Sequence, residues 1–341
     1  MKKVLCFAAA AMALFAACQK TTVVYDNDGQ QEIAFSAVNK IATKAPVEGT
    51  AFQDDYNMQV AAYLADGDGV ATGGRNYFNG TTFTKSTTYW TGGQYWPLSA
   101  ATMNFFAVEP EVAASGTGTP AITTTFGETN TTSHQRISST TVANNNADQY
   151  DVMYATGRQT KTAGSAPSGQ VGMIFNHAYS WLVFKFSKTS DAPEIIIKDI
   201  TVNNVSCDGT LSVTVGNADG ASGDFTATPE WSGNTSGNLS VYHTADLTIS
   251  TTPSEFNNGL LVIPGDPMSE FVITYTIAGQ EFTYTYTPDS TPAWESGKKY
   301  IFNISMSPSL IEIDPGVEAW DGDHDDDGDE DENDDEDVNL N

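Results

Sequence analysis

Basic residues are scarce in this chain. Its 341 residues include 15 Lys and Arg against 43 Asp and Glu, which gives a formal net charge of −28 at pH 7. A surface this acidic repels the phosphate backbone of nucleic acids and the anionic head groups of lipids. The composition therefore argues against nucleic acid as a partner, and any attachment to a membrane has to be covalent or hydrophobic.

Cysteine is almost absent as well. The chain contains only Cys6, Cys18 and Cys207, and the first two belong to the N-terminal segment discussed below. Cys207 then has no partner for an intrachain disulfide, so disulfides do not stabilise the fold. We expect Cys207 to behave as a small buried apolar side chain, and a reactive thiol is the alternative.

Sequence motifs of the common catalytic and metal sites are missing too. The chain has no H-E-x-x-H, no Cys/His spacing for zinc and no G-x-S-x-G, and the Gly-rich segment 67–74 lacks the Lys-Ser/Thr of a phosphate-binding loop. His177 directly precedes an apolar run, where a structural hydrogen bond is the expected role. We therefore predict neither an enzyme nor a bound cofactor.

Amphipathic patterns with helical periodicity do not extend beyond two turns. The chain is instead rich in Thr, Gly, Asn and aromatic residues, which favour strands and turns. This composition predicts an all-β protein. Several short predicted strands with turn signals between them further predict β-sandwiches of transthyretin or immunoglobulin type, and we expect two in tandem. The clearest predicted strands are Glu32–Val38, Glu194–Val205, Leu260–Pro264, Phe271–Ile277, Phe282–Thr287 and Tyr300–Met306.

The segment Val171–Ser187 is the most apolar one after the N-terminus, and from Trp181 it alternates with a period of two. It predicts a buried strand, and a division into two modules near Ser168. Asn79-Gly80, between aromatic flanks, predicts a two-residue hairpin turn, and Ala278–Glu281 predicts another hairpin. Residues 116–146 are polar and low in apolar side chains, so we expect a surface excursion or a mobile loop there.

Residues 1–17 have the character of a secretory signal peptide, with two lysines, an apolar run and then small residues. The junction Ala16-Ala17-Cys18 resembles the lipobox of bacterial lipoproteins. This resemblance implies cleavage between Ala17 and Cys18 and acylation of Cys18, and two or more acyl chains anchor a protein stably. The alternative is an ordinary signal peptide with an incidental cysteine. Gln19 in place of Asp favours the outer membrane.

The C-terminal segment 321–341 contains thirteen acidic side chains and no basic one. Such a run of like charges predicts a disordered tail. Within it, four carboxylates follow the spacing of calcium-binding loops, although Asp334 stands where a bidentate Glu is usual. A weak calcium site and a chance match are both open, and the candidate ligands are Asp323, Asp325, Asp327 and Asp331.

Four aromatic residues cluster at Tyr89, Trp90, Tyr95 and Trp96. Such a cluster is typical either of core and strand-pair packing or of a platform on which sugars stack. We favour packing and keep the sugar platform as the alternative.

Several motifs in order resemble the fimbrillin (Mfa-like) family of Bacteroidetes-type lipoproteins, which build type V pili or related surface structures. The first is the I-x-F-S-A strand with the A-T-K-A stretch that follows it. The others are Tyr89-Trp90 with M-N-F-F-A-V-E-P at 103–110, D-V-M-Y-A at 151–155, F-N-H-A-Y-S-W-L-V-F at 175–184, W-E-S-G-K-K-Y at 294–300, and a body that ends near Trp320.

The resemblance implies a lipid-anchored precursor that a protease cuts in its first loop. On this chain the cut falls between Lys44 and Ala45 and releases the strand Glu32–Val38, after which a strand of another fimbrillin subunit fills its place. The implied organisation is a signal peptide (1–17), a tether and propeptide (18–44), an N-terminal sandwich (45–168), a C-terminal sandwich (169–320) and an acidic tail (321–341).

The expected function is that of a cell-surface fimbrillin-like lipoprotein, a tip, accessory or structural pilus subunit that serves adhesion. Since the acidic tail lacks alternation, any donated strand has to come from residues 310–320, which favours a tip or accessory role. The expected location is the outer membrane or the fimbrium. Host or bacterial surface ligands are further candidate partners. The alternative is a monomeric lipid-anchored surface module that binds a ligand such as a glycan.

Overall fold

The computed structural model describes residues 31–38, 57–66, 70–86, 89–98, 101–109, 122–125, 135–139, 149, 151–162, 170–217, 225–241, 243–265, 268–288 and 293–319. Every regular element in these ranges is a strand, so the all-β prediction is confirmed for the described part of the chain. No helix there is long and apolar enough to span a membrane.

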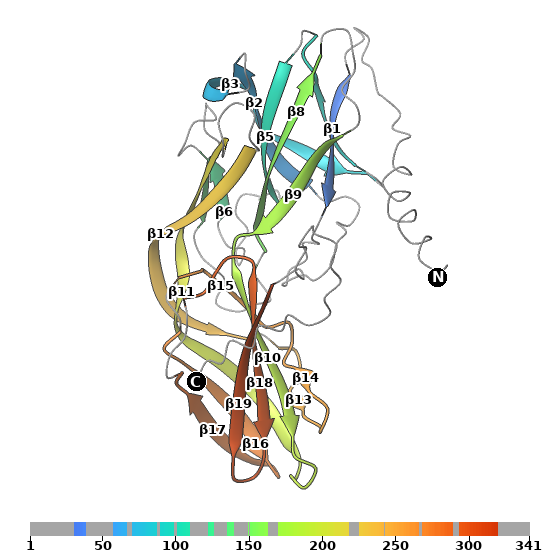
Figure 1. The fold of residues 1–341 in the computed structure, drawn as a ribbon. Helices are drawn as coiled ribbons and strands as arrows, with labels where there is room; N and C mark the ends of the chain where they lie inside the picture. The colour runs from blue at the N-terminus through green and yellow to red at the C-terminus, as the bar shows by residue number, and fades with distance from the viewer. Residues whose placement is uncertain are drawn as a thin grey trace, which may run out of the picture.

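The strands fall into one barrel and two sheets (Figure 1). Their bounds are β1 Glu32–Val38, β2 Asn57–Asp66, β3 Val70–Lys85, β4 Trp90–Tyr95, β5 Ala101–Glu109, β6 Ile122–Thr125, β7 Gln135–Ser139, β8 Met153–Lys161, β9 Val171–His177, β10 Ser180–Lys188, β11 Ile195–Asn217, β12 Phe225–Ser240, β13 Leu247–Thr248, β14 Ser254–Glu255, β15 Leu260–Val262, β16 Glu270–Ile277, β17 Gln280–Tyr286, β18 Lys298–Met306 and β19 Ile311–Ala319.

The barrel closes in the order β1-β4-β3-β2-β5-β8-β9 and lies at the top of Figure 1. Its interior is filled by aromatic and aliphatic side chains that alternate along the strands, as β9 shows with its strictly alternating buried and exposed residues. A closed seven-stranded barrel differs from the open two-sheet sandwich that we expected for this half, because β1 bridges the two strands that would otherwise be edges.

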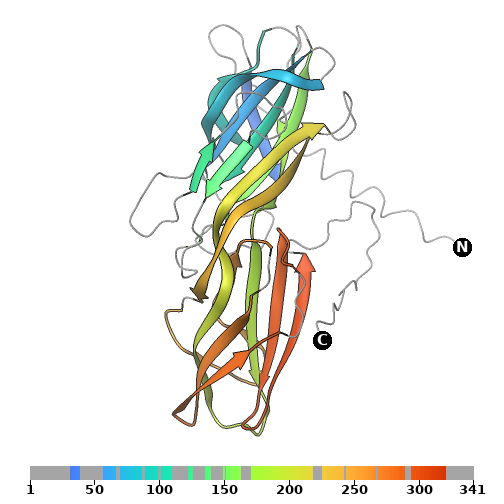
Figure 2. The ribbon, with the colours of Figure 1, turned by 90° about the vertical axis from the view of Figure 1, so that its left-hand side faces the viewer.

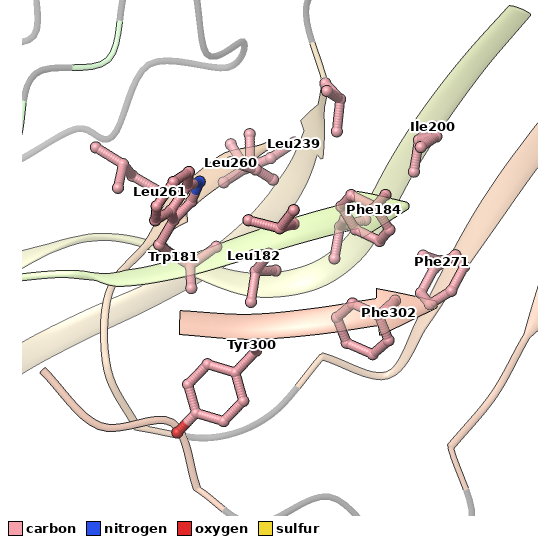
Figure 3. Close-up of a cluster of buried hydrophobic side chains, with 14 of the residues drawn as sticks. Trp181, Leu182, Phe184, Ile200, Leu239, Leu260, Leu261, Phe271, Tyr300 and Phe302 are labelled. Carbon is pink, nitrogen blue, oxygen red and sulfur yellow. The ribbon is translucent and has the colours of Figure 1, made fainter. Parts of the chain in front are cut away.

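The other strands form two sheets with a common core. One has the order β14-β10-β18-β19 with β15 beside β10, and the other has the order β17-β16-β11-β7-β6 with β12 and β13 beside β11. Phe184 of the first sheet stacks on Phe302 with 5.3 Å between ring centroids and meets Phe271 of the second sheet edge-on at 5.2 Å. Figure 3 shows these three rings together in the core.

The long strands β11 and β12 form a hairpin that reaches from the lower sheets toward the barrel (Figures 1 and 2). Near its far end β11 also pairs with β7, which in turn pairs with β6. These two short strands lie within residues 116–146. The polar excursion expected there therefore contributes two strands to a sheet, because Thr- and Ser-rich sequence can still pair through its backbone.

One of the two predicted hairpin turns is wrong and the other is confirmed. Asn79-Gly80 lies inside β3, at a bulge where the two residues oppose Ala61, and Gly80 has a φ of 63°. Asn-Gly suggested a turn because it readily adopts a positive φ. Here the positive φ of Gly80 belongs to a bulge within a continuous strand. In contrast, Ala278 and Gly279, both with positive φ, connect β16 and β17 as the sequence predicted.

The predicted strands are present, Glu32–Val38 with its predicted ends and the others with shifted ends. Val171–Ser187 divides into β9 and β10, with a short break at Ala178-Tyr179. β9 completes the barrel, whereas β10 is central to the five-stranded sheet. The division of the chain into modules near Ser168 stays a prediction, since that residue lies outside the described ranges.

Candidate functional site: the β1 seam and the junction below it

The N-terminal strand β1 closes the barrel. It pairs in parallel with β9, from Phe35 opposite Val171 to Val38 opposite Ile174. On its other side it pairs antiparallel with β4, where Phe35 lies opposite Trp90, with an irregularity between Glu32 and Ala34. One strand thus holds both edges of the barrel together, and we call the place that it fills the β1 slot.

The side chains of β1 are fixed by the barrel core. Ile33 and Phe35 are completely buried. The Phe35 ring meets Phe83 edge-on with 4.9 Å between centroids, and it meets Phe105 in the same way at 5.1 Å. Removal of β1 would therefore expose apolar side chains together with two rows of unpaired backbone groups, which is the surface that an incoming strand requires.

Two hydrogen bonds hold the start of β1 among the described residues. The backbone N–H of Gly93 donates to Oε1 of Glu32 at 3.0 Å, and the N–H of Trp96 donates to the carbonyl of Gln31 at 2.8 Å. The strand has only seven residues, and parallel pairing is slightly weaker per residue than antiparallel pairing. The buried side chains of Ile33 and Phe35 therefore make a large contribution to the stabilisation of β1 in its slot.

Below the slot, a buried polar pair ties the end of β9, which lines the slot, to the residues that precede the neighbouring barrel strand β8. Nδ1 of His177, the last residue of β9, lies 2.7 Å from Oδ2 of Asp151, and both side chains are completely buried. One residue further on each segment, the N–H of Ala178 donates to the carbonyl of Val152 at 2.8 Å. We expected a structural role for His177, and Asp151 is its partner in that role.

The break between β9 and β10 collects further hydrogen bonds. Nε1–H of Trp231 on β12 donates to the carbonyl of Ala178 at 3.1 Å, and the Trp231 ring packs on Tyr179 with 5.5 Å between centroids. The N–H of Gly297 donates to the carbonyl of Tyr179 at 2.9 Å, and the hydroxyl of Ser180 donates to the carbonyl of Glu295 at 2.7 Å. We call Gln149, Asp151, Val152 and residues 177–180 with these partners the junction.

Gln149 adds a second connection across the junction. Its buried side-chain amide accepts the N–H of Leu261 at 2.7 Å and donates to the carbonyl of the same residue at 3.1 Å. The amide therefore satisfies both backbone groups of Leu261, as a neighbouring strand would. The hydrogen bonds of the junction, which include the one from Trp231 of the β11–β12 hairpin, join the barrel to the two sheets.

Three separate sequence motifs thus meet in space. D-V-M-Y-A supplies Asp151, F-N-H-A-Y-S supplies His177 and the break that follows it, and W-E-S-G-K-K-Y supplies Glu295 and Gly297. Sequence reasoning identified each motif but not their meeting. The signal was a lone acidic residue and a lone histidine, each beside an apolar strand, where neither can be buried without a partner.

The two tryptophans of the candidate sugar platform are buried, whereas such a platform requires exposed ring faces. Trp90 and Trp96 are each only 2% exposed and belong to the barrel core, where Trp96 packs edge-on against Phe105. Packing is therefore confirmed as the role of both tryptophans. Tyr89 and Tyr95 are half-buried.

Cys207 is half-buried rather than fully buried, and its thiol lies 3.7 Å from the carbonyl oxygen of Thr235. Burial, and then the charge of Asp208, raises the pKa of this thiol. A raised pKa lowers the thiolate fraction at neutral pH, so the position does not favour reactivity. In the ranges that the structure describes, no three His, Cys, Asp or Glu side chains are grouped to hold a metal ion.

The remaining candidate residues lie outside the described residues. They are the lipidation and signal-cleavage residues Ala17 and Cys18, the propeptide-cleavage residues Lys44 and Ala45, and the acidic candidates Asp323, Asp325, Asp327 and Asp331.

Comparison with known proteins gives a family match and a shared fold. The model of the fimbrillin-like family matches residues 43–320, which is most of the chain. No curated protein matches the sequence. A candidate cell adhesion protein from Bacteroides uniformis has a similar structure, with a TM-score of 0.51 and 15% identity over 86% of this chain and 99% of that one. At this identity the similarity concerns the fold alone.

Two other solved structures are similar over the same extent. A candidate cell adhesion protein from Bacteroides ovatus has a TM-score of 0.47 and 15% identity over 86% of this chain and 99% of its own. A fimbrial protein from Bacteroides vulgatus has a TM-score of 0.44 and 12% identity over 85% of this chain and 99% of its own.

Proposed function

Because this chain belongs to the fimbrillin-like family, we propose that it is a tip or accessory subunit of a surface fimbria, or a structural subunit of one, that serves adhesion and has no catalytic role. The observation that carries this proposal is the position of β1. It is the first described strand of the chain, it closes the barrel alone, and its two buried side chains leave an apolar slot when it is removed.

Attachment to the cell is the first part of the proposal. The signal peptide is removed between Ala17 and Cys18, and Cys18 is acylated and holds the precursor in the outer membrane. The chain's net charge of −28 gives it no electrostatic attraction to anionic lipid, so the acyl chains are the anchor that its chemistry allows.

Strand exchange is the second part. A protease cuts between Lys44 and Ala45, which separates β1 from the barrel covalently while the core still holds it. A strand of another subunit then replaces β1, pairs with β4 and β9, and places apolar side chains where Ile33 and Phe35 were. Release of β1 before or during this exchange exposes apolar surface, which gives the incoming strand its driving force.

The properties of β19 support a tip or accessory position rather than a stalk position. A subunit that donates its C-terminal strand has to detach β19, which pairs with β18 along nine residue pairs and packs Ile311, Ile313 and Val317 against the core. β19 also contains Pro315, which cannot donate a backbone hydrogen bond in a new ladder. Accepting a strand is therefore easier for this chain than donating one.

In the alternative of a monomeric surface module, the candidate sugar platform included Trp90 and Trp96 together with Tyr89 and Tyr95. Since both indoles are buried in the barrel, they present no ring face to a sugar.

The test is limited digestion of the full chain with a lysine-specific protease. We expect a new amino terminus at Ala45, identified by mass spectrometry, with the released segment still bound. A synthetic peptide of residues 32–38 should then exchange into the cut protein, whereas a matched peptide with Ile33→Ser and Phe35→Ser should not. A first cut elsewhere, or equal binding of both peptides, would contradict the proposal.

The anchor is tested separately, so that its failure leaves strand exchange untouched. Wild-type chain from cells should enter the membrane fraction and carry the mass of acyl chains on Cys18, and a Cys18→Ala variant should lose both. An unmodified Cys18, or a mature chain that begins elsewhere, would contradict lipid anchoring.

A further inference from the structure

The free edges of the two sheets differ in how they are protected against pairing. β13 and β14 have two residues, β15 has three and β6 has four, so all are too short to template another strand. β12 pairs only with β11 among the described strands and has sixteen residues, but it contains Pro229 and its pairing is interrupted by register shifts. β19 is longer, but it contains Pro315 and carries Glu312, Asp314 and Glu318 on its outward face. Short length, proline and charge are the usual devices that keep an edge from pairing.

β17 has none of these devices. Its seven residues pair with β16 in regular register from Phe271 opposite Tyr286 to Ile277 opposite Gln280, without a bulge. The strand contains no proline and no lysine, and Glu281 is its only charged residue. Among the described strands it pairs only with β16, and it forms the edge of the seven-stranded sheet (Figure 1).

The aromatic side chains of β17 continue the apolar inner face of the sheet to its edge. Phe282 stacks on Tyr275 with 5.8 Å between centroids but is still 39% exposed. Tyr284 is half-buried against the core. On the other face, Thr283 and Thr285 are exposed. A long, regular edge with one apolar face is a template for another strand of the same kind.

We propose that β17 is an interaction surface for a second copy of this chain, and that two copies associate by antiparallel pairing of β17 with β17. The contact is independent of the β1 slot, which lies in the barrel. It therefore adds a second association to the strand exchange proposed above.

The register follows from the sequence of the strand. Only a two-fold axis at Thr283 pairs all seven residues, with Phe282 opposite Tyr284 and Glu281 opposite Thr285 of the partner copy. The aromatic residues of both copies then lie on one face, where cross-strand aromatic pairs stabilise a sheet. The two Glu281 side chains are four residues apart along the strand, about 14 Å, and are screened from one another at physiological salt.

A second copy fits this edge better than the C-terminal segment of the same chain. Residues 321–337 contain no apolar residue, so they offer no face that could cover Phe282 and Tyr284. A second β17 offers the same aromatic alternation. Since the two copies are both strongly acidic, their association should strengthen as salt screens the repulsion between them.

The first test is sedimentation velocity of the full chain over a range of concentrations, at low and at moderate salt. We expect a reversible monomer–dimer equilibrium that shifts toward dimer with salt. Thr283→Lys places two like charges opposite each other and should weaken the dimer at least tenfold. The matched variant Thr285→Lys places lysine opposite Glu281 in two symmetric pairs and should tighten it about two- to thirtyfold.

Both threonines are exposed on the same face of the same strand, so any general effect on folding is shared and is checked by thermal unfolding. A wild-type chain that stays monomeric at every concentration overturns the proposal. So does a dimer on which the two lysine variants act alike. The second test is disulfide cross-linking in a background without native cysteines: Thr283→Cys should cross-link and Thr285→Cys should not, and the reverse result excludes this register.

Discussion

Nδ1 of His177 lies 2.7 Å from Oδ2 of Asp151, and both side chains are completely buried. His177 ends β9, the parallel partner of β1, and Asp151 precedes β8, the other neighbour of β9. The pair therefore fixes the lower end of the strand that lines the β1 slot. A slot whose wall is held in this way keeps its shape when β1 leaves it.

The first prediction concerns this pair. Asp151→Leu leaves His177 buried without its partner and should lower the free energy of unfolding by about 3–5 kcal/mol, whereas the double variant Asp151→Leu, His177→Leu should recover part of the loss. Urea unfolding of the wild type, both single variants and the double variant measures the coupling. Glu255→Gln is the control, because the Lys185–Glu255 contact at 3.7 Å is exposed and should contribute less than about 1 kcal/mol. Equal effects at the two sites would show that the buried pair is not a special constraint.

The second prediction concerns β1. Phe35→Ala removes a completely buried ring with two edge-on aromatic contacts and should lower the free energy of unfolding by about 3–5 kcal/mol. After cleavage in the first loop, the variant strand should also leave its slot faster, which size-exclusion chromatography of the cut protein measures. Ser36→Ala, on the half-buried opposite face of the same strand, should change neither quantity appreciably. Slower release from the Phe35→Ala protein would contradict the account of the slot.

The third prediction uses two glycines with almost the same backbone conformation. Gly259 has a φ of 70° and Gly297 a φ of 71°, so alanine is strained at both, by about 1–2 kcal/mol. A Cβ at Gly259 would overlap the carbonyl oxygen of Leu182 and approach Trp181, whereas a Cβ at Gly297 would meet nothing within 4 Å. Gly259→Ala should therefore be clearly more destabilising than Gly297→Ala in thermal unfolding. Equal losses would mean that backbone strain alone decides both.

Local features of the sequence predicted the strands well. β1 was predicted with its observed ends, and the β16–β17 hairpin was predicted with its turn, because alternation and turn chemistry act over a few residues. Asn79-Gly80 was misread for the same reason. A positive φ suits a turn and a bulge equally, and only the partner strand β2 decides between them.

Pairings between distant residues were not predictable in this way. Nothing near Glu32–Val38 indicates that β1 pairs in parallel with β9, more than a hundred residues later, and closes a barrel. Likewise, nothing in the sequence indicates that Asp151 and His177 are in contact. Each lies next to an apolar strand, and a polar side chain that is buried there requires a partner. The family resemblance predicted the motifs and their order along the chain, whereas only the structure shows that three of them are in contact at the junction.

The last prediction concerns alkaline pH. Tyr154, in the D-V-M-Y-A motif, is 4% exposed, and burial raises the pKa of its phenol to about 12 from the ordinary 10.0. Between these two values the unfolded chain loses the proton while the folded one keeps it, so the free energy of unfolding falls as pH rises from about 10 to about 12, by about 2–3 kcal/mol. Below pH 10 the contribution is fully present. Tyr154→Phe removes this proton and should make the alkaline decline shallower, with the remaining slope due to tyrosines such as Tyr300, whose pKa burial also raises. Urea unfolding at a series of pH values measures the slope, and ultraviolet titration at each pH follows the phenolate. An unchanged slope in Tyr154→Phe would show that this phenol ionises alike in both states, and that the ring is reached by water where β8 meets the core.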